Sequence, residues 1–147
     1  MGRLHWQLSD GLMLYARRAI RPLSSAMHEL SIAMSIVELA EEEAASRGVQ
    51  IEAVHLKLGA LSGVVKEALL SCYEMACEGT TVQGSRLLVE DIPVIIFCAT
   101  CNTQRNLSSV QQFTCPECGT PSWEVLQGKE LEVVALEVTE CAPNRAS

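Results

Sequence analysis

Four of the seven cysteines fall into two closely spaced pairs, which carry the clearest chemical signal in this 147-residue sequence. The pairs are CATC (Cys98 and Cys101) and CPEC (Cys115 and Cys118), and thirteen residues separate them. Each pair can direct two thiolates at one centre, and two facing pairs give the tetrahedral sulfur cage typical of structural Zn²⁺. The protein would fill all four ligand positions, so the pattern predicts a structural metal site without room for a substrate.

Other uses of paired cysteines compete with this interpretation. A redox-active pair needs a thiolate of lowered pKa at a helix N-terminus, as in thioredoxin-like chains. The sequence around the pairs lacks the strand–helix–strand pattern that would supply such a helix. An iron ion held by four thiolates remains an alternative to zinc.

The segment MHEL (residues 27–30) is a second candidate for metal chemistry. If Met27 began the chain, its amine, the amide nitrogen of His28 and the His28 imidazole could form fused chelate rings. The amide nitrogen of Glu29 could complete a nitrogen-rich plane, which suits Ni²⁺ or Cu²⁺. The simpler interpretation is that His28 and Glu29 only begin a helix, where the dipole favours an acid.

Hydrophobic periodicity predicts the elements that must position these residues. The expected elements are a helix over 29–47, a strand over 51–59, a helix over 64–78, and strands over 86–97 and 130–139. Pro93 lies inside the second strand and predicts an edge position, a bulge or a break there.

This order predicts an α+β fold in which two helices pack on a three-stranded, mainly antiparallel sheet. We expect strands 86–97 and 130–139 to pair directly, with a zinc-ribbon module inserted between them. The predicted domains are a nickel-binding α+β domain (27–97 plus 121–140), a ribbon module (98–120), a tail (141–147) and an N-terminal extension (1–26).

Charge separates the extension from the rest of the chain. Residues 1–26 hold four arginines and one aspartate, which gives +3, whereas the whole chain carries −7, so the remainder carries −10. The extension has no continuous apolar region typical of a secretory signal. We expect it to be disordered or an artefact of the assigned start, with translation beginning at Met27.

Composition also excludes function classes. An acidic body argues against nucleic-acid binding, and no apolar run reaches the ~20 residues of a membrane helix, so we expect a cytoplasmic protein. The sequence offers no nucleophile–base set or phosphate loop, so we expect no enzyme activity. His55 is expected on a strand surface, and Cys72 and Cys77 as core thiols rather than metal ligands.

Several segments together resemble the HypA/HybF family of nickel-insertion accessory proteins for NiFe-hydrogenase maturation. They are MHELSIAMSIVELAEEEA, VHLKLGALSGVVKEAL, the cysteine module and GKELEVVALEV. The resemblance implies a nickel metallochaperone in which His28 is the essential Ni(II) ligand, assisted by Met27 and Glu29. It also implies that Cys98, Cys101, Cys115 and Cys118 hold structural Zn(II).

The resemblance further implies partners: the GTPase HypB, the hydrogenase large subunit as recipient, and urease maturation proteins. The alternative function is a zinc-ribbon protein-interaction module without nickel delivery. The chain departs from the family pattern at Asn102, where members usually have glycine, and in residues 1–26, which precede the family's starting Met-His-Glu.

Overall fold

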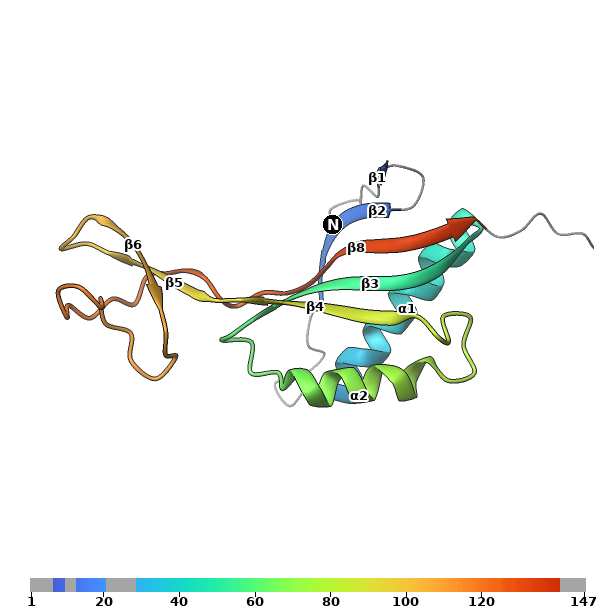
Figure 1. Cartoon of the computed structure of the whole chain (residues 1–147), viewed down its shortest axis with the longest axis horizontal. Helices are drawn as coiled ribbons and strands as arrows, with labels where there is room; N and C mark the ends of the chain where they lie inside the picture. The colour runs from blue at the N-terminus through green and yellow to red at the C-terminus, as the bar shows by residue number, and fades with distance from the viewer. Residues whose placement is uncertain (1–6, 10–12, 21–28, 141–147) are drawn as a thin grey trace, which may run out of the picture.

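The computed structural model describes residues 7–9, 13–20 and 29–140 (Figure 1). The elements in chain order are β1 (Gln7–Ser9), β2 (Met13–Ala19), α1 (Glu29–Arg47), β3 (Val49–Gly59), α2 (Lys66–Cys77), β4 (Arg86–Ile92), β5 (Val94–Cys98), β6 (Thr103–Leu107), β7 (Val125–Gln127) and β8 (Leu131–Glu140). The α+β class is confirmed, and both helices lie where the periodicity predicted them.

The main sheet has five strands in the order β1-β2-β8-β3-β4. β3 runs parallel to β4 and antiparallel to β8, so it lies between the two strands that we expected to pair directly. That expected pairing is wrong, because a helical crossover from β3 through α2 brings β4 alongside β3 in the parallel direction. The three predicted strands are therefore neighbours, but in a different order.

Both helices cover the same face of this sheet (Figure 1). Their buried residues join those of the sheet in one aliphatic core, which includes Ile36 of α1, Leu69 of α2 and Leu56 of β3. Tyr73 of α2 is buried in this core, and its hydroxyl lies 2.7 Å from the Ser85 hydroxyl, which satisfies the phenol. Burial of these side chains holds α1 and α2 in fixed positions on the sheet.

Part of the N-terminal extension belongs to the main sheet, contrary to the expectation of disorder. β2 pairs antiparallel with β8, and β1 pairs with β2. Leu14 and Ile20 are 2% and 7% exposed and belong to the same core as the helices. Residues 13–20 do not alternate between apolar and polar types, because Arg17 and Arg18 are adjacent and apolar residues lie on both sides of them. Periodicity therefore did not predict this strand.

A second sheet, in the order β6-β5-β7, carries the cysteine module at the far end of the molecule (Figure 1). It begins at Val94, directly after Pro93, so the predicted break at this proline is confirmed. Val94, Ile96 and Leu107 form a small core separate from the main one. The module therefore extends over residues 94–127, beyond the predicted limits of 98–120.

Two glycines form a close backbone contact where the sheets join. The Gly59 N–H donates to the Glu130 carbonyl at 2.6 Å, and the Leu61 N–H donates to the Gly128 carbonyl at 2.7 Å. A side-chain carbon added at Gly59 would lie 2.2 Å from the Gly128 carbonyl oxygen. Glycine at position 59 is thus required for the linker before β8 to pass against the end of β3.

We expect Gly59→Ala to lower the free energy of unfolding by about 1–3 kcal/mol, because the added methyl group forces the two backbones apart. Urea denaturation followed by circular dichroism measures this change. Ala60→Ser is the matched control, because residue 60 is exposed and adjacent. Equal stability of the Gly59→Ala protein and the control would show that the junction can relax without cost.

Candidate metal centre

Two tight turns bring the four predicted cysteines together. Cys98 ends β5, and Cys101 lies in the turn before β6. Cys115 and Cys118 lie in the loop between β6 and β7, where the Gly119 N–H donates to the Cys115 carbonyl at 2.8 Å. Each pair is therefore fixed by local backbone geometry before any metal is considered.

Asn102 and Gly119 follow directly after the two pairs and adopt the same unusual conformation. Both have left-handed backbones, with φ values of 52° and 74°. Glycine adopts this conformation without strain, and asparagine tolerates it better than most residues. The departure from the family's usual glycine at position 102 is thus compatible with the turn.

The four sulfur atoms all lie within 4.8 Å of one another. Cys98 Sγ lies 3.6 Å from Cys118 Sγ, and Cys101 Sγ lies 3.9 Å from Cys115 Sγ. A tetrahedral ion with metal–sulfur distances of about 2.3 Å requires sulfur–sulfur distances of about 3.8 Å. The arrangement fits one tetrahedral ion of zinc size, with all four ligand positions supplied by the chain.

Hydrogen bonds from the loop tune two of these thiols toward the thiolate form. The backbone N–H of Cys118 lowers the pKa of Cys115 to about 6. The Thr120 hydroxyl lowers the pKa of Cys118, whose Sγ lies 3.1 Å away. Cysteine binds metal ions as the thiolate, so a lowered pKa at these two residues favours metal binding.

Arg105 on β6 adds a positive charge beside the cluster. A hydrogen bond from Arg105 lowers the pKa of Cys101, yet contacts with the other thiols and desolvation raise it to about 11 overall. The same contact with Cys101 raises the pKa of Arg105, which stays charged. A guanidinium here would offset the negative charge of a tetrathiolate metal site. Sequence reasoning missed both Arg105 and Thr120, because neither belongs to a spacing motif.

The loop bearing Cys115 and Cys118 is attached to β5 by polar contacts. Ser122 is buried, and its hydroxyl donates to the Phe97 carbonyl, while its N–H donates to the Phe113 carbonyl at 2.8 Å. The rings of Phe113 and Trp123 lie 5.8 Å apart. These contacts place the second cysteine pair opposite the first.

One of the three predicted nickel ligands falls in the part of the chain that the structure describes. Met27 and His28 fall outside the described residues, and Glu29 is the first residue of the helix. The Val65 N–H donates to Glu29 Oε1 at 3.1 Å. Val65 is the N-cap residue of α2 and has no side chain able to cap it, so the Glu29 carboxylate serves there instead. This long-range cap fixes the beginning of α1 against α2.

The other candidate residues have structural positions. His55 Nε2 lies 3.2 Å from Glu137 Oε2 on the sheet, with Arg86 3.9 Å from the same oxygen. Cys77 is buried and Cys72 half-buried against the main core, as expected for core thiols. None of these three residues joins the four-cysteine cluster.

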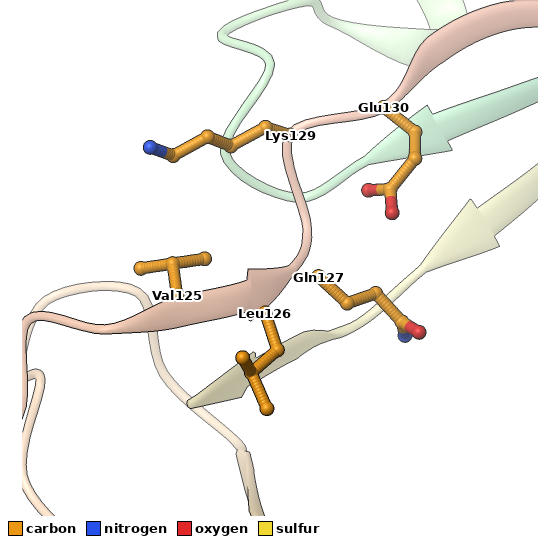
Figure 2. Close-up of a pocket in the computed structure, with 5 residues that line it drawn as sticks. All are labelled: Val125, Leu126, Gln127, Lys129 and Glu130. Atoms are coloured by element: carbon orange, nitrogen blue, oxygen red, sulfur yellow. The ribbon is translucent and has the colours of Figure 1, made fainter. Parts of the chain in front are cut away.

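A pocket of about 250 Å³ lies beside the linker that joins β7 to β8. Figure 2 shows the five residues that line it. Val125 and Leu126 extend to opposite sides of β7, and Lys129 and Glu130 leave the linker in different directions. Glu130 is engaged, because its Oε1 accepts from the Gly128 N–H at 2.8 Å. The five lining residues have no arrangement typical of catalysis. Among the described residues, no helix is long and apolar enough to cross a membrane.

Comparison with known proteins agrees with this geometry. A family profile described as hydrogenase/urease nickel incorporation, metallochaperone, hypA, matches residues 27–138. The chain belongs to the HypA family. This membership confirms the resemblance found in the sequence and identifies the chain as a member of a nickel-incorporation family.

Individual HypA proteins are similar to this chain over nearly the same number of residues as the family profile. The hydrogenase maturation factor HypA of Roseiflexus sp. (strain RS-1) is 48% identical over 118 residues, covering 80% of this chain and 96% of the relative. That of Chloroflexus aurantiacus (strain J-10-fl) is also 48% identical, over 76% of this chain and 98% of the relative. The solution structure of the Ni metallochaperone HypA from Helicobacter pylori is 26% identical, with a TM-score of 0.55, and covers 78% of this chain and all of that one.

We expect Cys101→Ser to weaken metal binding at the cluster by at least about 100-fold, because it removes a ligand. Changing only a residue that hydrogen-bonds to a ligand already lowers metal affinity by about 10–100-fold. The β5–β7 sheet should then lose protection from hydrogen exchange, whereas α1 and β3 keep theirs, because their core is separate. Metal analysis and exchange mass spectrometry measure both effects. Cys72→Ser is the control, and unchanged metal content in Cys101→Ser would contradict the four-cysteine site.

Proposed function

We propose that this HypA-family chain binds one Ni(II) at the start of α1 and delivers it to the hydrogenase large subunit. The observation that carries the proposal is the position of MHE, because the family match begins at Met27, the first residue of that motif. His28 would supply its imidazole and amide nitrogens. Nickel would pass to the recipient by ligand exchange, so the protein would not act as an enzyme.

The hydrogen bond between Glu29 and Val65 indicates which atoms of Glu29 belong to the proposed ligand set. Its carboxylate accepts the hydrogen bond from Val65, so we assign it an anchoring task at the base of α2. In this proposal the backbone nitrogens of Met27 and Glu29 would supply the further donors to nickel. This division would place the nickel donors at a fixed point on the helix pair.

We propose that Cys98, Cys101, Cys115 and Cys118 hold Zn(II), which supplies folding energy to a module with only a small core. The sulfur separations support zinc, and no ligand position remains for exchange. Zinc would therefore be a permanent part of the protein, whereas nickel would be its cargo.

The proposed partners follow from family membership. They are the GTPase HypB, the hydrogenase large subunit and urease maturation proteins, and the proposed location is the cytoplasm. The net charge of −7 supports metal cations rather than nucleic acids as ligands.

A zinc-ribbon interaction module is the alternative function. Trp123 is 80% exposed, and Val110 and Leu126 are also exposed on the same module. Exposed aromatic and aliphatic side chains of this kind are typical of protein-contact surfaces. This alternative predicts that partner binding depends on Trp123 and is indifferent to His28.

We expect His28→Ala to weaken Ni(II) binding by at least about tenfold, a loss of about 1.4 kcal/mol, because the imidazole donor is removed. Isothermal titration calorimetry on the zinc-loaded protein measures the change. His55→Ala is the matched control, because His55 is a described histidine that contacts Glu137 on the sheet. Nickel binding that survives His28→Ala, or that is lost in the control, would exclude the proposed ligand.

We expect a chain beginning at Met27 to bind Ni(II) at least about tenfold more tightly than the 147-residue chain, because its free amine adds a nitrogen donor. Adding a single glycine before Met27 provides the control, since it restores a peptide nitrogen without restoring the extension. The glycine form should bind like the 147-residue chain. Equal affinity in all three forms would show that the amine at Met27 is not a ligand.

A further inference from the structure

The outer edge of β8 is the feature from which this inference starts. β8 is ten residues long, and β3 satisfies the backbone groups along its inner edge. Without residues 7–20, the backbone N–H and C=O groups of its other edge would be unpaired. Such an edge is a template for an added strand.

β2 matches this edge along most of its length. Its register with β8 runs from Met13 opposite Glu137 to Ala19 opposite Glu132, with one shift between Tyr15 and Arg18. The Ile20 N–H then donates to the Leu131 carbonyl at 2.8 Å. The segment therefore pairs with β8 through the backbone from Leu131 to Glu137.

Side chains add specificity to this backbone pairing. Leu14 and Ile20 are buried in the main core, near the two ends of β2. Arg18 lies 3.9 Å from Glu42 of α1, so the basic extension also meets the acidic body. Two buried apolar side chains and a complementary charge are typical of a segment that binds a specific site, and not of a terminal segment without specific contacts.

The strand nevertheless lies outside the part of the chain that the family shares. The profile match begins at Met27. The alignments with the Roseiflexus and Chloroflexus relatives include 80% and 76% of this chain, and they already cover 96% and 98% of the relatives. β3, β4, β8 and both helices all fall within the matched residues. β1 and β2 are thus additions to a sheet whose other strands, β3, β4 and β8, lie within the family match.

We propose that the outer edge of β8, with the hollow that Leu14 and Ile20 fill, is a strand-docking site, and that residues 13–20 are its occupant. In the 147-residue chain the site is closed by the chain's own strand. In a chain beginning at Met27 the site is open and accepts the same segment as a separate peptide. The extension thereby determines whether the sheet edge is available. This inference rests on the sheet and not on the proposed nickel function.

A peptide of residues 7–21 tests the site on the zinc-loaded protein that begins at Met27. We expect saturable one-to-one binding by calorimetry, with slowed amide exchange along β8. A Leu14→Asn peptide should bind at least about thirtyfold more weakly, because it loses a buried anchor. An Arg17→Asn peptide should bind nearly normally, since Arg17 is exposed at the register shift. Absence of binding to a folded protein, or equal binding of the two variants, would overturn the proposal.

The same two substitutions in the 147-residue chain provide a second test if the shorter chain does not fold. Leu14→Asn should speed amide exchange in β8 by at least about thirtyfold relative to Arg17→Asn. Equal exchange in both variants would overturn the proposal. The shorter chain can also be tested for self-association. If the peptide reverses self-association, an open edge is supported. If the peptide leaves self-association unchanged, the proposal is contradicted. His28→Ala should leave peptide binding unaltered, so failure of the nickel proposal is distinguishable.

Discussion

The backbone pairing of β3 on both of its edges is the constraint on which the rest of the structure depends. β3 forms ladders with β4 on one side and with β8 on the other, over most of its eleven residues. The side chains of Ile51, Val54 and Leu56 enter the core beneath the helices, and a register irregularity separates Ile51 from the alternation of the other two. Because its backbone groups are satisfied by two partners, β3 sets the positions of β4 and β8 in the main sheet.

The same strand also determines how the cysteine module is carried. β3 ends at Gly59, where the backbone meets the linker at Gly128 and Glu130. Gln127 contributes a further tie, since its Nε2 donates to the Pro93 carbonyl at 3.1 Å. Two chain segments therefore cross between the sheets at one closely packed point. A module with its own core and four thiols can be stabilised by a metal while the main core remains independent.

Local patterns in the sequence were sufficient to predict both helices, the segments that form β3, β4, β5 and β8, and the metal cluster, but not β1, β2, β6 or β7. The helix periodicity after Glu29 and the spacing of the cysteines each depend on a few neighbouring residues. Pairing order could not be predicted in this way, because whether β4 joins β3 or β8 depends on the path of α2 between them. The docking of β2 was missed because its apolar positions are few and lie beside arginines, and burial of Leu14 depends on a partner more than a hundred residues away.

Local sequence patterns could not predict the role of Arg105 or the contact between Glu29 and Val65, for a similar reason. Each acts across an element boundary, and each involves a charged side chain that would look like ordinary surface in the sequence. Thr120 differs, since it follows Gly119 directly and could have been suspected as a neighbour of the second cysteine pair. The spacing motif located the four sulfurs, and the tertiary structure supplied the groups that adjust their charge.

The position of the proposed nickel ligands raises an electrostatic requirement that the chain can meet. A helix N-terminus carries about half a positive charge, so it opposes a divalent cation placed there. The start of α1 lies against the start of α2, and the Glu29 carboxylate lies between them. Its negative charge offsets both dipoles, and amide nitrogens that lose their protons on binding nickel would add further negative charge. In this arrangement the Glu29 carboxylate would assist a bound cation without ligating it, since a carboxylate drawn to the metal would leave the N–H of Val65 without this hydrogen bond.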